Sequence, residues 1–174
     1  MKDKITYVKD EGEKEMILEL MKRYEENVVP LHHQLRFQVI QNDLNEVNII
    51  SDGQSITGII DFGDVTFSHL ISEVATAMYY MGYDSEDFLY WSCLMLKEFH
   101  RISPLTNDEL RMLFFKMGIK SCQCRVNGAV ALHSSPDNEY LLWKDEHHRK
   151  TLKTLFSLNP AEVEKYMRDM IESE

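Results

Sequence analysis

Three oxygen-bearing side chains occur in an order that suits phosphoryl transfer. Asp43 is followed five places later by Asn48, and Asp61 then opens the sequence Asp-Phe-Gly-Asp at residues 61–64. With this spacing, the first Asp orients the hydroxyl that attacks the γ-phosphate, while the Asn and second Asp hold Mg²⁺ on the phosphates. Mg²⁺ is a hard cation that takes carboxylate and amide oxygens as ligands. The pattern therefore predicts Asp43 as a catalytic residue and Asn48 with Asp61 as metal ligands.

A predicted β-hairpin brings these three residues together. Residues 47–50 and 56–60 are β-branched runs, and the turn between them contains Asp-Gly, which is a strong hairpin signal. Reflection of the chain about this turn places Asn48 near Asp61 at the open end of the hairpin. Asp43 lies in the loop just before that end, so we expect all three side chains to converge.

Each half of the pattern also has a simpler explanation. An Asp five residues before an Asn is common in solvated loops, and Asp-Phe-Gly can be a strand end in which Phe62 fills the core. Both halves in this order on one hairpin are much less expected by chance, which favours the catalytic interpretation. Asp64 is either a further acidic group near the metal or a turn-stabilising residue.

The rest of the chain predicts mostly helices. Apolar residues at three-and-four spacing predict an N-terminal helix that Pro30 ends, and a short strand follows at residues 37–40. Thr106 with Glu109 forms a capping box for a helix that we expect to end near Cys124. Further helices are expected at residues 70–81, 85–99, 139–155 and 160–171. The predicted order is a small β-hairpin region followed by helices.

Charge and composition narrow the classes of partner. The 174 residues carry 19 Lys and Arg against 29 Asp and Glu, a formal net charge of −10. This argues against nucleic-acid binding, which needs clustered cations, and is compatible with cationic small molecules or metal–nucleotide complexes. Three cysteines do not make a disulfide framework, and no apolar stretch suits a signal peptide or a membrane span. We expect a soluble protein of a reducing compartment that binds no membrane.

Two other residue groups invite a functional reading. The His pairs at residues 32–33 and 147–148 have no third ligand at a recognisable spacing, so we expect surface histidines. Several acidic residues near the expected cleft are either solvated or available to hold a substrate ammonium group. These residues are Asp84, Glu86, Asp87, Asp137 and Glu139.

The motif-bearing residues resemble a known family. Residues 38–82 contain Gln-Asn-Asp-Leu-Asn-Glu-Val-Asn, then Ile-Ile-Asp-Phe-Gly-Asp, and later Glu-Val-Ala-Thr-Ala-Met-Tyr-Tyr-Met-Gly. Together they resemble the aminoglycoside phosphotransferase and choline kinase superfamily, most closely its hydroxylysine kinase branch, which residues 136–141 also resemble. A protein kinase is disfavoured because an apolar helix closely follows Asp-Phe-Gly and no Ala-Pro-Glu occurs.

The resemblance implies a fold, an activity, cofactors and a cytoplasmic setting. The fold would be α+β, a protein-kinase-like C-terminal lobe that is mostly helical, with a small β-hairpin carrying the active site. The activity would be γ-phosphate transfer from GTP or ATP, with Mg²⁺, to a hydroxyl of an amino-containing substrate, 5-hydroxy-L-lysine in this branch. Asp43 would orient or deprotonate that hydroxyl, and Asn48 with Asp61 would hold Mg²⁺.

The sequence departs from the family pattern at two places. Gln41 stands where the family has a His that supports the catalytic loop, and we expect Gln41 to form hydrogen bonds in its place. No glycine-rich lid, strand lysine or partner glutamate lies upstream, and residues 1–36 are too short for an N-terminal nucleotide lobe. We expect residues 1–174 to be one domain, the catalytic lobe alone, whose exposed lobe interface favours self-association. The alternative is an inactive lobe that acts as a binding or regulatory module.

Overall fold

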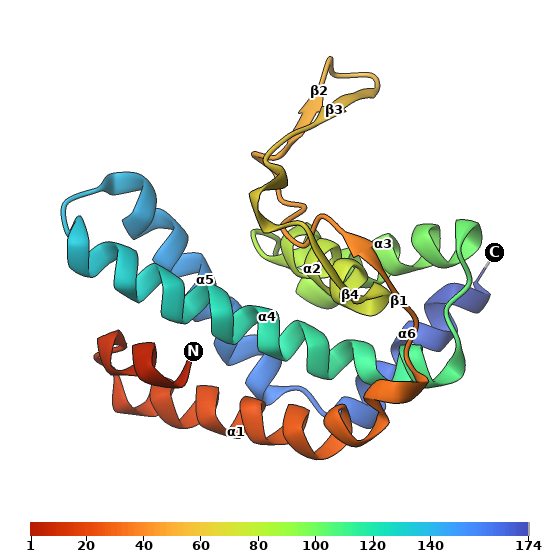
Figure 1. The fold of residues 1–174 in the computed structure, drawn as a ribbon, viewed down its shortest axis with the longest axis horizontal. Coiled ribbons are helices and arrows are strands. Elements are labelled where there is room, and N and C mark those ends of the chain that lie inside the picture. Colours follow the sequence, from red (N-terminus) through yellow and green to blue (C-terminus); the bar gives the residue numbers. More distant parts are fainter. Residues whose placement is uncertain (174) are drawn as a thin grey trace.

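Helices form most of the chain, and the strands occupy one stretch between the first long helix and the second (Figure 1). The computed structural model describes residues 1–173. Its elements, in chain order, are η1 (Lys2–Tyr7), α1 (Glu11–Asn27), η2 (Val29–Gln34), β1 (Phe37–Ile40), β2 (Ile49–Ser51), β3 (Ile56–Ile59), η3 (Phe62–Asp64), β4 (Thr66–His69), α2 (Leu70–Gly82), α3 (Phe88–Ile102), α4 (Asn107–Ser134), α5 (Glu139–Ser157) and α6 (Pro160–Glu172). The predicted α+β class, mostly helical with a small β-hairpin, is confirmed, and the structure adds a second antiparallel pair of strands.

Local sequence signals explain where the helices begin. The Asp10 side chain accepts a hydrogen bond from the backbone N–H of Glu13 at the start of α1. The predicted capping box is present at the start of α4, where Thr106 and Glu109 each accept from the other's backbone N–H. The helix expected at residues 85–99 instead begins at Phe88, because Asp87 acts as its cap.

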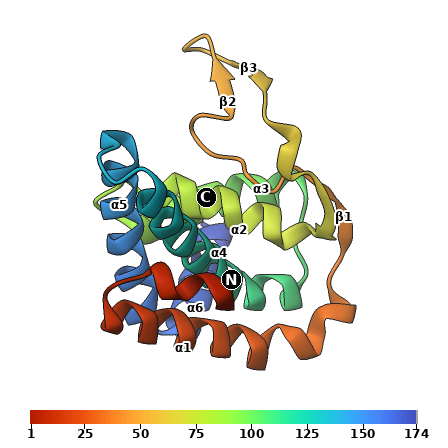
Figure 2. The ribbon, with the colours of Figure 1, turned by 60° about the vertical axis from the view of Figure 1, so that its left-hand side comes forward.

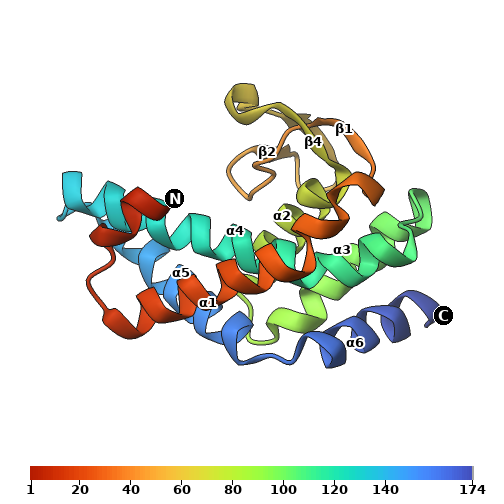
Figure 3. The same ribbon diagram turned by 60° about the horizontal axis from the view of Figure 1, so that its bottom comes forward.

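Helix α4 is the centre of the fold. It packs against α1, α2, α5 and α6, as Figures 2 and 3 show from two sides. Our prediction that it ends near Cys124 was wrong, since it continues to Ser134. Buried residues keep a helical spacing past Cys124, but one of them is the charged Arg125, so apolar residues alone do not mark this part of the helix.

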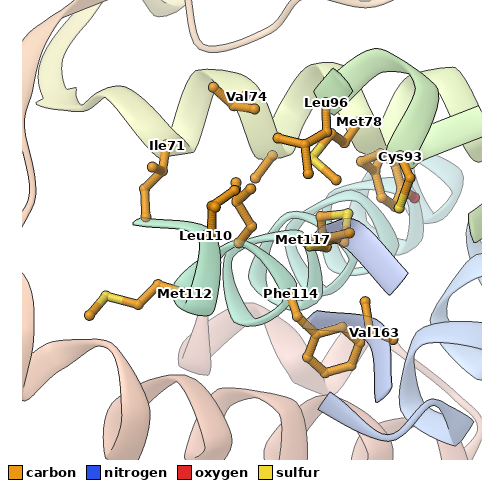
Figure 4. Close-up of a cluster of buried hydrophobic side chains, with 14 of the residues drawn as sticks. Ile71, Val74, Met78, Cys93, Leu96, Leu110, Met112, Phe114, Met117 and Val163 are labelled. Carbon is orange, nitrogen blue, oxygen red and sulfur yellow. The ribbon is translucent and has the colours of Figure 1, made fainter. Parts of the chain in front are cut away.

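Two clusters of apolar side chains hold these helices together. The larger one joins α2 to α4 and includes Met78 and Met117, with Val163 of α6 closing it below (Figure 4). The smaller one includes Ile17 of α1 and Val126 of α4. Burial of such side chains contributes roughly 1.5–3 kcal/mol each.

A buried ionic network also joins three helices. The guanidinium of Arg125 in α4 lies 2.8 Å from Glu13 of α1 and 2.9 Å from Asp145 of α5. Arg149 contacts the same two carboxylates from the edge of the network. Because a buried charge is stable only when it is paired, these contacts fix how α1 and α5 lie on α4.

The strands form two separate antiparallel pairs. The predicted hairpin is confirmed as β2 and β3, with Ile49 opposite Ile59, and it stands away from the helices (Figure 1). The predicted strand at residues 37–40 is β1, and it pairs with β4, which the sequence did not reveal. We call residues 37–69 the β-arm. No helix within residues 1–173 is both long and apolar enough to cross a membrane.

Candidate functional site

The carboxylate of Asp43 receives hydrogen bonds on both oxygens. Its Oδ2 accepts from Nδ2 of Asn45 at 2.9 Å and from Nδ2 of Asn48 at 3.3 Å. Its Oδ1 accepts from Nζ of Lys120 at 3.1 Å and from the hydroxyl of Tyr80 at 3.4 Å. One side of the carboxylate is therefore held by its own loop, and the other by helices α2 and α4.

The backbone of this loop is fixed from two directions. Asn42 has a positive φ of 69°, a left-handed conformation that Asn tolerates better than most residues. Its backbone N–H donates to Glu73 of α2 at 2.6 Å, and burial raises the pKa of this carboxyl. The loop is thus attached to the first turn of α2.

Gln41 connects the loop to the segment that carries Asp61. Its Oε1 accepts from the backbone N–H of Asp43 at 2.7 Å, and its Nε2 donates to the carbonyl of Asp61 at 2.8 Å. The expectation that Gln41 forms supporting hydrogen bonds is therefore confirmed.

Asn48 and Asp61 lie at the open end of the hairpin, as the turn position predicted. The carbonyl of Asn48 accepts from the N–H of Ile60 at 3.0 Å, which places it opposite the residue just before Asp61. Nδ2 of Asn48 donates to the Asp43 carbonyl at 2.9 Å. Asp61 adopts a left-handed backbone with φ of 56°, and one of its oxygens accepts from Gly63 N–H at 3.3 Å.

The donor set at this end fits Mg²⁺. Within residues 1–173 no hydrogen bond reaches Oδ1 of Asn48 or the second carboxylate oxygen of Asp61. A hard cation that keeps several waters and binds phosphate needs one or two such oxygens from the protein. Among the described residues, no group of three or more His, Cys, Asp or Glu could hold a metal ion.

A cavity of about 560 Å³ opens beside Asp43. The β-arm and the start of the chain form part of its wall, and the facing wall comes from α4 and α5. Polar side chains dominate that helical wall, and they are Lys120, Gln123, Asn127, Lys144 and His148. Asp64 and Tyr80 also line the cavity, whereas Asn48 and Asp61 do not.

Two lysines of this wall were not foreseen from the sequence. Lys120 lies between the Asp43 carboxylate and the Tyr80 ring, whose centroid is 5.1 Å away. Burial raises the pKa of Tyr80, so its hydroxyl stays protonated and donates. Burial alone would lower the pKa of Lys144, but Tyr140 and Glu46 raise it above its ordinary value.

The acidic residues considered as ammonium ligands do not line this cavity. Asp84 lies 2.7 Å from Nε2 of His147, and Asp87 caps α3. The expectation that His148 lies on the surface was wrong. It is buried, with Nδ1 2.8 Å from the Tyr79 hydroxyl, and burial lowers its pKa to about 4.

Comparison with known proteins supports the family resemblance seen in the sequence. Residues 1–90 match the phosphotransferase enzyme family. The chain is 30% identical to hydroxylysine kinase of Xenopus laevis over 169 residues, which covers 91% of this chain and 45% of that protein. It is 28% identical to hydroxylysine kinase of Mus musculus over 161 residues, covering 87% of this chain and 43% of that protein. The chain thus spans less than half the length of these relatives.

Proposed function

The chain belongs to the phosphotransferase enzyme family, and from this premise we propose that it transfers the γ-phosphate of GTP or ATP to a small acceptor. The acceptor would be an amino-containing alcohol, with 5-hydroxy-L-lysine as the first candidate because the relatives are hydroxylysine kinases. The three free thiols favour a reducing compartment, and we propose the cytoplasm.

One observation supports this proposal most directly. The Asp43 carboxylate accepts a hydrogen bond from Nδ2 of Asn48, and Asp43 lines a cavity large enough for an amino acid. In phosphoryl transfer the protein contributes mainly positioning and charge neutralisation, which require groups held in this way.

The residues of this chain would divide the work. Asp43 would accept the proton of the acceptor hydroxyl. The hydroxyl oxygen would attack the γ-phosphorus atom, and the bond between that phosphorus and the bridging oxygen would break. The nucleoside diphosphate would leave with that bridging oxygen. Asn48 and Asp61 would hold Mg²⁺, which neutralises charge on the phosphates when bound. Gln41 would hold the backbones of Asp43 and Asp61 at a fixed distance from each other.

The experiment is a transfer assay with the purified chain, Mg·GTP or Mg·ATP, and 5-hydroxylysine. Phosphorylated acceptor formed above the rate without protein supports the proposal. A folded chain that forms no product contradicts autonomous activity.

A second candidate function is a catalytically inactive lobe that binds a small molecule or a regulatory partner. The observation that favours it is the ion pair of Asp43 with Lys120, because it occupies the carboxylate that would receive the proton. Titration with Mg·GTP distinguishes the two, since a kinase binds the metal–nucleotide complex and a degraded site does not.

A further inference from the structure

We propose that Lys120 and Lys144 bind the carboxylate of an amino-acid acceptor, and that this contact frees Asp43 for the reaction. The inference rests on the proposed function and names the part of the acceptor that the helical wall recognises. Both lysines line the cavity beside Asp43, one from α4 and the other from α5.

The two ammonium groups are mostly withdrawn from solvent. Their side chains are 13% and 18% exposed, respectively. Lys120 Nζ lies 5.1 Å from the centroid of the Tyr80 ring, and Lys144 Nζ lies 4.9 Å from that of Tyr140. Aromatic faces of this kind hold a cation in place, so the positive ends are positioned before an acceptor enters.

Each lysine already pairs with a carboxylate of the catalytic loop. Lys120 lies 3.1 Å from Asp43, and Lys144 lies 3.6 Å from Glu46. The wall therefore presents two ammonium groups in geometries that carboxylate oxygens can occupy. Glu46 is exposed, so an acceptor carboxylate can take its place on Lys144 without leaving a buried charge unpaired.

The hydrogen bonds that Asp43 already accepts mean that Lys120 must move to another anion before catalysis. Its Oδ1, on the cavity side, accepts from both Lys120 and Tyr80. A substrate hydroxyl must donate to this carboxylate, so one of these donors has to move away. An acceptor carboxylate offers Lys120 another anion and keeps its charge paired. A neutral or purely cationic acceptor offers none and leaves Lys120 on Asp43.

The net charge of the chain cannot explain a preference for the amino acid. With a net charge of −10, long-range attraction favours the more cationic of two ligands. An amino acid is less cationic than its carboxamide. A preference for the amino acid must therefore come from local cations in the cavity.

The test measures equilibrium binding of 5-hydroxylysine and of its α-carboxamide by calorimetry. The wild-type chain is expected to bind the amino acid about tenfold more tightly than the amide, the loss typical of one charged hydrogen bond. In Lys144→Met this ratio should fall by at least half, because only Lys120 remains to bind the carboxylate, and in Lys144→Arg it should be retained. Lys150→Met, on the exposed side of the same helix, should keep the wild-type ratio.

Several outcomes would overturn the inference. These are equal affinity for the two ligands, tighter binding of the amide, a full ratio in folded Lys144→Met, or binding of neither ligand. Circular dichroism of each variant establishes folding, and Lys144→Gln replaces Lys144→Met if the latter does not fold.

Failure of this inference is separable from failure of the proposed function, because binding needs neither nucleotide nor transfer. A ratio near ten without any product contradicts the kinase and supports the carboxylate site. Product formation with equal KM values for the acid and the amide contradicts the carboxylate site and supports the kinase.

Discussion

Nε2 of Gln41 donates to the carbonyl of Asp61 at 2.8 Å, which ties the loop of the proposed catalytic residue to the segment of a proposed metal ligand. The other end of the same amide accepts from the backbone N–H of Asp43 at 2.7 Å. A single side chain therefore sets the spacing between two parts of the site.

Loss of this bridge should slow transfer without unfolding the chain. Gln41→Ala is expected to lower kcat by about 10- to 100-fold, because small displacements of reacting groups are costly in positioning catalysis. Gln41→His, which restores the family residue, should retain more activity than Gln41→Ala. Gln38→Ala, an exposed change on β1, is the control. Equal kcat for Gln41→Ala and Gln38→Ala would contradict the bridging role.

The buried ionic network predicts a large effect on stability. Arg125→Met leaves Glu13 and Asp145 buried with Arg149 as their remaining partner, and should reduce the free energy of unfolding by about 3 kcal/mol. Urea denaturation measures this loss. Arg111→Met breaks an exposed pair with Asp108 and should cost less than about 1 kcal/mol. Comparable losses in both variants would be inconsistent with the network.

The buried histidine predicts acid sensitivity. The pKa of His148 is lowered by burial from 6.5 to about 4, so unfolding takes up a proton between these pH values. Stability should therefore fall as the pH falls from about 6.5 to about 4, and His148 contributes roughly 2 kcal/mol of the loss by pH 4.5.

The measurement is urea denaturation of wild type and His148→Gln at pH 7.0 and pH 4.5. The variant should lose less stability between the two pH values than wild type. His33→Gln, at an exposed position, should behave as wild type. If His148→Gln and wild type lose the same amount, titration of His148 does not contribute.

The β-arm predicts self-association. Val39 is 67% exposed and Phe67 is 69% exposed, and β1 and β4 form a two-stranded sheet whose outer edges are unpaired within residues 1–173. We propose that a second copy of the chain covers this surface, because open edges and apolar side chains both favour strand pairing.

Sedimentation velocity over a range of concentrations tests this proposal. Wild type should form a dimer as the concentration rises, and Phe67→Ser should shift the equilibrium toward monomer. Lys165→Ser, at an exposed position of α6, is the control. A wild-type chain that stays monomeric at all concentrations would contradict the association.

Short-range signals in the sequence were sufficient for most of the fold. Helix periodicity, the Thr106–Glu109 capping box and the Asp-Gly turn are local, and each appears where it was predicted. Strand β4 was missed because its partner β1 is far away in the sequence and its apolar side chains are exposed. The length of α4 was missed because the residues after Cys124 include the buried but charged Arg125 and the polar Asn127, which lines the cavity.

The site could be predicted only on the β-arm side. Turn geometry was sufficient to place Asn48 opposite Ile60, the residue before Asp61, and the Asn48 side chain contacts Asp43 in the loop beside it. Lys120 is 77 residues from Asp43 in the sequence, and no local pattern distinguishes it from other helical lysines. Its contact with Asp43 depends on where α4 lies relative to the loop that carries Asp43, which is a property of packing.

The proposed role of Asp43, to receive the proton of the acceptor hydroxyl, is tested by transfer from Mg·GTP or Mg·ATP to 5-hydroxylysine by wild type and Asp43→Asn. Phosphorus NMR follows the product, and Asp52→Asn in the exposed hairpin turn is the control. Asp43→Asn should lose at least about 100-fold in rate, on the order of a general-base contribution, while it unfolds like wild type and Asp52→Asn keeps full activity. A folded Asp43→Asn variant with the wild-type rate would contradict this role of Asp43.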